Sequence, residues 1–351
     1  MTLEQRIIAF AKLGDFLKQF SQDEFERNDT TPFNDLFFDG FKLQIKHARE
    51  ANSWFTLDHV VFTFKNWSEL LNKNSLRAWT SSYTLNSDKP KTVAVIMAGN
   101  IPLVGFHDFL SVLLSGHRIL IKQSSNDKHF LPLIAKYLEY VESDFKGYIN
   151  FNKEKLTNFD AAIATGSNNT ARYFEYYFGK YPHIIRNNRN SLAVLTGNES
   201  TEELKNLGED IFRYFGLGCR SVSKIFIPKE YDFDQLFKAV YEYKDIINYK
   251  KYENNYDYNK AVYLMSEFKL VENGFLMLKE DPSYASPIAT LFYEYYDDIS
   301  VLEEQLKKDT EKIQCIVSND IENSVNFGET QQPTLTDYAD GVDTMAFLSN
   351  L

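Results

Sequence analysis

The chain is poor in cysteine and in basic charge, and each shortage excludes a class of protein. Its 351 residues include only two cysteines, Cys219 and Cys315, far apart in the sequence. That spacing excludes a disulfide framework and favours a reduced, cytoplasmic location. Lysine and arginine total 38 against 49 acidic residues, and the net charge of -11 disfavours general binding to nucleic acid or to anionic membranes.

Long apolar runs and metal-binding patterns are also missing. No segment reaches the roughly 18 apolar residues of a membrane-spanning helix. The best candidate, VAVIMAGNIPLVGF, is interrupted by Asn100 and Pro102. The N-terminus, MTLEQRIIAF, lacks the pattern of a secretory signal, and no cysteine and histidine cluster has the spacing of a zinc site. The length and the 44% of hydrophobic residues predict a soluble globular protein of two domains.

The residues that are present predict helices first and then an α/β pattern. Apolar side chains recur at helical spacing through residues 1–85. From Lys91 onward, strand-like runs alternate with helical segments, and the first of these helices is expected to end at Gly116. The segments are KTVAVIMAG, FHDFLSVLLSG, HRILIKQSS, LPLIAKYLEYVESDF and FDAAIATGS. This alternation predicts an open parallel sheet with right-handed crossovers.

A second α/β pattern begins near Asn190. The strand NSLAVLTG is followed by the helix STEELKNLGEDIFRYFG, in which Ser200 and Glu203 form the pattern of a capping box. The strand KIFIP, the helix DFDQLFKAVYEYKD and the strand PIATLFYEY continue the unit. The tail QQPTLTDYADGVDTMAFLSNL predicts a turn at Asp340 and Gly341, followed by an extended, partly apolar end.

Small and polar residues follow the first three predicted strands. The corners are AGN (98–100), KQSS (122–125) and TGS (165–167). Ligands of open parallel sheets bind at the carboxyl ends of the strands, where these corners lie. Hydroxyls, glycines and a lysine suit phosphate and ribose, although the missing GxGxxG pattern counts against a standard Rossmann site.

The stretch FGLGCRSVSKIFIPKEY places Cys219 at a corner before a strand. Gly216 and Gly218 give the backbone freedom there, and the strand ends at Pro228. A cysteine that only fills space would lie inside an element, because a free cysteine packs like a small hydrophobic residue. Local sequence alone leaves a packed thiol and a reactive thiol equally open. Cys315, in the apolar run KIQCIVSN, is expected to lie in the core.

Four of these segments together resemble motifs of the aldehyde dehydrogenase superfamily. GLGCRSVSK resembles its nucleophile segment, GNIPL its asparagine-x-proline-leucine segment, LIKQSSND its leucine-lysine-proline-serine segment and ATGS its threonine-glycine-serine corner. The segments NNRNSLAVLTG, GLGCRSVSKIFIP and DYADGVDTMAFL resemble more closely the LuxC-type fatty acyl-CoA reductases. The resemblance covers roughly residues 75–351.

The resemblance implies an aldehyde dehydrogenase-like α/β fold with three parts. Residues 1–189 would form the helical lead-in and the dinucleotide-binding domain, and residues 190–328 the catalytic domain. Residues 329–351 would form a C-terminal return with a short strand that adds to the sheet of a neighbouring subunit. A homodimer or a larger homo-oligomer is therefore expected.

The resemblance also implies the site residues. Cys219 would attack a thioester carbonyl, and its backbone N–H together with the Asn100 amide would hold the oxyanion. A serine at Ser125, where NAD-preferring relatives often carry a glutamate, would not repel a 2′-phosphate, so NADPH (as NADP+ after reaction) is the expected cofactor. The cofactor-binding residues would be Lys122, Ser124, Ser125, Thr165, Gly166 and Ser167.

One departure from the superfamily bears on the reaction. With the sequences aligned on Ser191, the glutamate that activates water in oxidising aldehyde dehydrogenases falls on Arg186. Loss of that base removes hydrolysis of an acyl-enzyme and leaves thioester exchange and hydride transfer. The expected reaction is reduction of a long-chain fatty acyl-CoA or acyl-protein thioester to the aldehyde, with an acyl-activating synthetase as a plausible partner.

Other interpretations remain open. Cys219 with a histidine such as His183 would make an acyltransferase or thioesterase that needs no nucleotide, and a non-catalytic partner protein would keep the fold alone. Several residues also have plain structural explanations: a turn cap for Asn100, a solvated strand end for Lys122, and polar positions for His107 and His117. Arg186 and Arg189 could lie at the surface or contact a phosphate of coenzyme A.

Overall fold

A computed structural model describes residues 1–85, 89–166 and 168–351. The chain divides into two compact units. Unit 1 contains residues 1–187 and 334–351, and unit 2 contains residues 188–333. The sequence predicted boundaries after residues 189 and 328, whereas the boundaries of the units fall after residues 187 and 333, and the tail belongs to unit 1.

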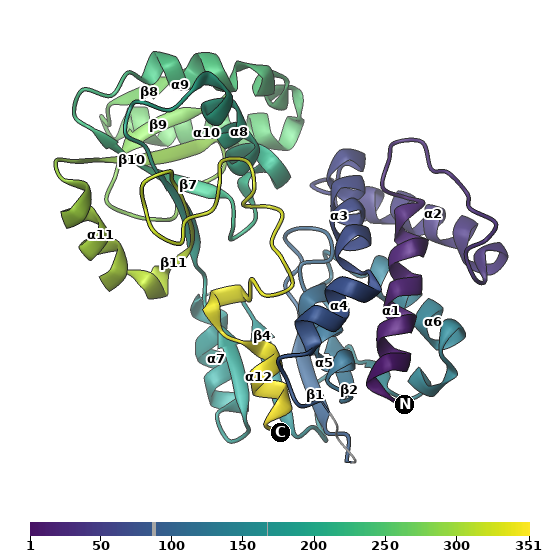
Figure 1. The fold of residues 1–351 in the computed structure, drawn as a ribbon. Helices are drawn as coiled ribbons and strands as arrows, with labels where there is room; N and C mark the ends of the chain where they lie inside the picture. Colours follow the sequence, from purple (N-terminus) through teal and green to yellow (C-terminus); the bar gives the residue numbers. More distant parts are fainter. Residues whose placement is uncertain (86–88, 167) are drawn as a thin grey trace. The chain divides into compact units, whose positions relative to one another are not determined.

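Unit 1 begins with the helices that the apolar spacing predicts (Figure 1). The first has a capping box, in which the Thr2 hydroxyl accepts from the backbone N–H of Gln5 and the Gln5 side chain accepts from the backbone N–H of Thr2. The four helices are α1 (Leu3–Lys18), α2 (Asn34–Ala51), α3 (Leu57–Leu70) and α4 (Lys73–Thr80). Several of their phenylalanines contribute to the main hydrophobic core of the unit, as expected for packing residues.

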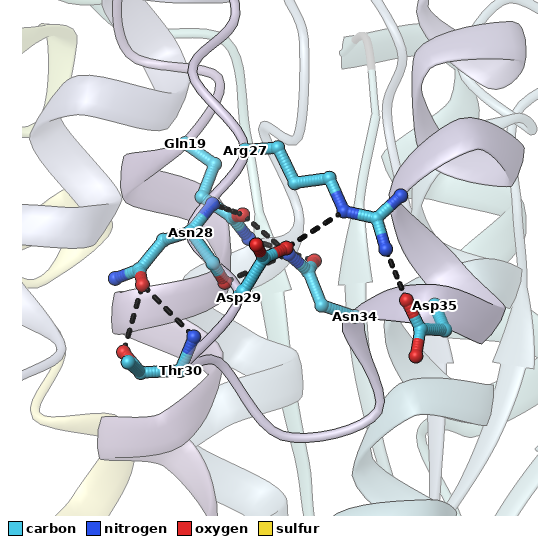
Figure 2. A network of polar contacts seen from close by, with 7 residues as sticks. All are labelled: Gln19, Arg27, Asn28, Asp29, Thr30, Asn34 and Asp35. Carbon is cyan, nitrogen blue, oxygen red and sulfur yellow. Dashed lines mark hydrogen bonds and ion pairs between the residues drawn. The ribbon is translucent and has the colours of Figure 1, made fainter.

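Side-chain amides hold the loop between α1 and α2 (Figure 2). Gln19 and Asn34 exchange two hydrogen bonds, at 3.1 and 2.8 Å, and the backbone N–H of Asn28 donates to Gln19 Oε1 at 2.7 Å. Phe33, which precedes α2, has a left-handed backbone with φ of 57° and provides no side-chain cap. The buried amides therefore fix the start of α2 where the usual cap is missing.

The sheet of unit 1 confirms the predicted parallel arrangement and has five strands. Their order is β3-β2-β1-β4-β5, and all neighbours pair in parallel. The strands are β1 (Thr92–Ile96), β2 (Arg118–Lys122), β3 (Ile149–Phe151), β4 (Ala161–Thr165) and β5 (His183–Arg186). The helices of this part are α5 (Phe106–Leu114), α6 (Phe130–Val141) and α7 (Asn168–Phe178).

Both faces of this sheet are covered, which explains its continuous apolar runs. Along β1, the side chains of Val93 and Val95 join the core that includes α1, α5 and α6, whereas Ala94 joins a second cluster that includes Phe178 of α7. Successive residues of a strand point to opposite faces. A strand with helices on both sides must therefore be apolar at every position.

Unit 2 has a six-stranded sheet in the order β11-β6-β7-β10-β9-β8, in which only the β8–β9 pair is antiparallel. The strands are β6 (Asn190–Val194), β7 (Val222–Pro228), β8 (Leu270–Glu272), β9 (Met277–Glu280), β10 (Thr290–Tyr296) and β11 (Ile313–Val317). The helices are α8 (Thr201–Phe212), α9 (Phe233–Ala239), α10 (Lys250–Met265) and α11 (Ile299–Lys308). The capping box predicted at Ser200 and Glu203 is confirmed.

The tail differs from its prediction. The turn is present, because Asp340 and Gly341 both have positive φ, but the expected extended end is wrong. Helix α12 (Thr344–Ser349) begins where Asp343 accepts from the N–H of Ala346 at 2.8 Å, and it packs against α5 (Figure 1). Residues 344–349 are therefore helical and do not form the expected C-terminal strand.

Candidate active site

Cys219 lies at an unusual backbone corner of unit 2. Three consecutive residues before it, Tyr214, Phe215 and Gly216, have left-handed φ of 56°, 57° and 74°. Such angles are unfavourable for residues with a Cβ, so the surrounding structure must enforce them. The corner follows α8 and precedes β7, and the side chain of Cys219 is exposed. The structure thus presents this thiol at the surface of its unit instead of packing it in the core.

Ser191 fixes the backbone of this corner from the neighbouring strand β6. Its hydroxyl donates to the carbonyl oxygen of Cys219 at 3.0 Å and lies 3.0 Å from the sulfur of Cys315. Cys315 occurs at a register shift between β11 and β6 and is half-buried, whereas the sequence predicted a place in the core. The Ser191 hydroxyl therefore connects the two cysteines of the chain. At the level of sequence, Ser191 served only to align the chain with the aldehyde dehydrogenases, and its contact with the Cys219 carbonyl was not predicted.

The predicted cofactor residues gather at one edge of the sheet of unit 1. Because β2, β1 and β4 are adjacent and parallel, the segments after their carboxyl ends lie at the same edge. Asn100 and Ser125 are exposed at this edge. Lys122, Ser124, Thr165 and Gly166 are half-buried there, and Ser167 lies outside the described residues.

Two of the loops at this edge are tightly packed against each other. A Cβ at Gly99 would lie 2.5 Å from the hydroxyl oxygen of Ser124, so only glycine allows the approach. The Ser124 hydroxyl in turn accepts from the N–H of Asn126 at 3.2 Å. The loop that carries Asn100 and the loop that carries the predicted ribose-binding residues are therefore one packed unit.

Asp127 joins the same two loops and was not predicted from the sequence. Its carboxylate accepts from the N–H of Leu103 at 2.7 Å, and Leu103 has a left-handed φ of 55°. Burial raises the pKa of Asp127 to about 7, although the hydrogen bond from Leu103 opposes the shift. The acid thus holds the loop after β1 in the conformation that presents Asn100.

Arg186, at the end of β5, is a buried ion-pair partner. Its guanidinium makes two hydrogen bonds to the carboxylate of Asp108 on α5 and a third to the Thr344 hydroxyl at 3.0 Å. The suggestion that Arg186 is a surface residue or contacts a coenzyme phosphate is therefore wrong. Arg189, which is half-buried, donates instead to the carbonyl oxygen of Thr310 at 3.1 Å.

Two histidines bind the tail. Nε2 of His107 donates to the carbonyl oxygen of Leu335 at 3.0 Å, and Nε2 of His117 donates to that of Leu348 at 2.9 Å. Burial lowers the pKa of both imidazoles. They are polar anchors within unit 1, as one of the sequence interpretations expected. His183, in β5, bonds through Nδ1 to the carbonyl oxygen of Tyr181.

Metal-binding clusters and membrane-spanning helices are both missing from the described residues. In that part of the chain, no group of three or more histidine, cysteine, aspartate or glutamate side chains is arranged to hold a metal ion. None of the helices that the structure describes combines the length and the apolar character needed to cross a bilayer.

Comparison with solved structures identifies the fold. Aldehyde dehydrogenase 21 from Physcomitrella patens, in complex with succinate, matches with a TM-score of 0.66 and 11% identity over 92% of this chain and 74% of that chain. An NAD+ complex of aldehyde dehydrogenase from Bacillus cereus matches with a TM-score of 0.62 and 13% identity. The match covers 92% of this chain and 73% of that chain. At this identity the similarity shows the fold, which is that of the aldehyde dehydrogenases.

Comparison with family models identifies the family. No curated protein matches the chain significantly. Residues 5–242, more than half of the chain, match the model described as acyl-CoA reductase (LuxC). The expected resemblance is thus confirmed, and the chain belongs to the LuxC family of acyl-CoA reductases.

Proposed function

We propose that this chain reduces a long-chain fatty acyl thioester to the aldehyde with NADPH, through an acyl-cysteine intermediate on Cys219. The observation that carries the proposal is the exposed thiol of Cys219 on a backbone corner that Ser191 holds, in a member of the LuxC family. A thiolate is the strongest nucleophile among protein side chains at neutral pH. The acyl donor would be acyl-CoA or an enzyme-bound acyl thioester.

The proposed acylation exchanges one thioester for another. The Cys219 sulfur forms a bond to the acyl carbon, and the bond from that carbon to the carrier sulfur breaks, so the carrier leaves as a thiol. The backbone N–H of Cys219 and the side-chain amide of Asn100 are the proposed donors to the oxyanion. Donors of this kind typically contribute several kcal/mol to the transition state, on the order of 3 kcal/mol each.

The carboxyl edge of the unit 1 sheet fits a nicotinamide dinucleotide by the chemistry of its donors. Lys122 would meet the adenosine ribose or its 2′-phosphate, and Ser124 and Ser125 provide hydroxyls beside it. Thr165, Gly166 and Ser167 would line the pyrophosphate and the nicotinamide. When bound, NADPH supplies the hydride that reduces the acyl carbon. Cys219 then leaves that carbon as a thiolate and the aldehyde is released.

Arg186 supports reduction over hydrolysis. In this chain the position of the water-activating glutamate of oxidising aldehyde dehydrogenases holds a guanidinium, which stays protonated and accepts no proton. Its donors are bound to Asp108 and Thr344. An acyl group on Cys219 would therefore meet no general base from this position, and transfer of a hydride would be the productive outcome.

The test follows cofactor consumption and the product together. Wild-type protein with a fatty acyl-CoA and NADPH should lower the absorbance of reduced nicotinamide and release fatty aldehyde. Cys219→Ser should abolish turnover and keep NADPH binding, whereas Cys315→Ser, the matched control, should keep turnover. The intact mass of the wild type after incubation with acyl-CoA should show one bound acyl group. The mass of Cys219→Ser should show none.

Three outcomes would contradict the proposal. Release of free fatty acid without consumption of NADPH would support the thioesterase interpretation. Undiminished turnover in Cys219→Ser would refute the nucleophile. The third outcome combines two results: iodoacetamide alkylates Cys219 no faster than an ordinary thiol, and the protein shows no turnover. This outcome would support a non-catalytic partner protein.

A further inference from the structure

Asp210 is a buried carboxylate on α8 that none of the steps above uses. Its side chain is fully buried, with 0% of its surface exposed. One oxygen accepts from the N–H of Gly328 at 2.7 Å. The other accepts from the N–H of Thr330 at 3.0 Å and from its hydroxyl at 2.8 Å. Three donors from one short segment therefore converge on this acid.

Burial of the Asp210 carboxylate at this position costs free energy of folding. Among the described residues, every hydrogen-bond donor to Asp210 is neutral. Burial raises the pKa of Asp210 to about 6, although the bonds from Gly328 and Thr330 oppose the shift. Burying a carboxylate without a cation costs free energy that an apolar residue would not. Leu207 and Ile211 on the same helix show the apolar alternative.

The segment that Asp210 holds also contacts the nucleophile corner. The carbonyl oxygen of Thr330 accepts from Nε of Arg220, the residue after Cys219. The Gln331 side chain donates to the hydroxyl of Ser221 at 3.2 Å. Residues 330 and 331 thus connect α8 on one side with residues 220 and 221 on the other, across separations of 110 to 120 residues in the sequence.

We propose that Asp210 is a positioning residue for Cys219, acting through Thr330 and Arg220. The inference rests on the proposed acyl-cysteine chemistry. Arg220 and Ser221 follow Cys219 directly, and Ser191 holds the Cys219 carbonyl from β6. The peptide that bears the thiol and the oxyanion-binding N–H is therefore fixed from two sides. Misplacement of a reacting group by about 1 Å lowers a rate by up to about 100-fold.

The test compares variants that weaken the contact by one group at a time. Thr330→Val removes the hydroxyl donor to Asp210, and Thr330→Ser keeps it. Asp210→Asn keeps the shape and replaces one acceptor oxygen by a donor. The control is Asp298→Ala, since Asp298 caps α11 in the same unit by accepting from Ser300 and makes no described contact with the corner.

Three quantities are measured: the single-turnover rate of acylation by acyl-CoA from intact mass, the Kd of acyl-CoA, and the rate of Cys219 alkylation by iodoacetamide. Asp210→Asn and Thr330→Val should slow acylation about 10- to 100-fold and leave the Kd within about twofold. Alkylation should slow at least about threefold. Thr330→Ser should behave as the wild type, and Asp298→Ala should lower only the melting temperature.

The outcomes distinguish failure of the positioning role of Asp210 from failure of the proposed acyl-cysteine chemistry. Wild-type rates of acylation and alkylation in folded Asp210→Asn or Thr330→Val would overturn the positioning role. Equal losses in Asp298→Ala would also overturn it, because they would show a general effect of stability. If the wild type is alkylated at Cys219 but never acylated, the proposed function fails, and the alkylation rates still decide whether Asp210 positions the thiol.

Discussion

The substitution Asp127→Asn tests the electrostatics at the edge of the unit 1 sheet. Burial raises the pKa of Asp127 from its ordinary value of 3.8 to about 7. The folded chain therefore binds this proton more tightly than the unfolded chain. The resulting stability is complete below about pH 4 and is lost as the pH rises through about 7. Asparagine has nearly the same shape and does not titrate.

The size of the effect follows from the shift in pKa. A difference of about three pKa units corresponds to roughly 4 kcal/mol between acidic and alkaline pH, and about 2.5 kcal/mol of it falls between pH 5 and pH 8. The amide oxygen of the substituted side chain can still accept from the N–H of Leu103. The free energy of unfolding of the variant, relative to wild type, should therefore increase by about 2.5 kcal/mol across that range.

Urea unfolding at pH 5, 6, 7 and 8 measures this difference. Tryptophan fluorescence is a suitable signal, because Trp54, Trp67 and Trp79 are the only tryptophans and all belong to unit 1, as Asp127 does. The exposed Asp39, substituted by asparagine, controls for the loss of one negative charge. If the difference in free energy of unfolding between wild type and Asp127→Asn stays constant from pH 5 to pH 8, burial does not raise the pKa of Asp127 and the argument is refuted.

Three further predictions concern the ion pair, the nucleophile corner and the cofactor. Asp108→Asn should lower the free energy of unfolding of unit 1 by about 3 to 5 kcal/mol, measured by the same fluorescence, because it leaves the charge of Arg186 buried without its partner. Ser191→Ala should slow acylation of Cys219 about tenfold in single-turnover mass measurements, because the Cys219 carbonyl loses its donor. Ser125→Glu should raise the Kd of NADPH at least about tenfold and that of NADH little, measured by nicotinamide fluorescence, because a carboxylate would repel the 2′-phosphate.

Short-range patterns predicted most of the fold. The run around Val93 to Val95 is apolar at every position because helices cover both faces of its strand, so a buried parallel strand was the natural interpretation. The Ser200 and Glu203 capping box requires only residues three apart, and it forms as predicted. Signals of this kind depend on local spacing, which the sequence displays directly.

Features that depend on distant contacts were missed or mistaken. The end of the tail reads as extended, yet it forms the six-residue helix α12 because Met345 and Leu348 bury themselves in the core of unit 1. The strands β3 and β5 are only three and four residues long and carry polar residues, so they gave no clear pattern. Tertiary packing decides such short elements.

The same distinction applies to the site. The segments with Asn100, Lys122 and Cys219 follow strand ends or precede a strand, and recurring motifs mark them. Their assigned roles stay predictions. Asp127 and Asp210 were not found, because each acts on a partner 24 to 120 residues away and no local pattern surrounds it. In the sequence, an acid that the fold holds through distant donors looks the same as a surface acid.

Arg186 links the chemistry of the family to the architecture of unit 1. A glutamate at its position would face the carboxylate of Asp108 in a buried environment, where two neighbouring acids cannot both ionise. Arginine instead forms the ion pair and also donates to Thr344, the first residue of α12. Under the proposed alignment, arginine at this position would remove a base for hydrolysis, and its hydrogen bond to Thr344 anchors the tail. Arg186→Glu would therefore remove the anchor and place two acids side by side, of which at most one would be ionised.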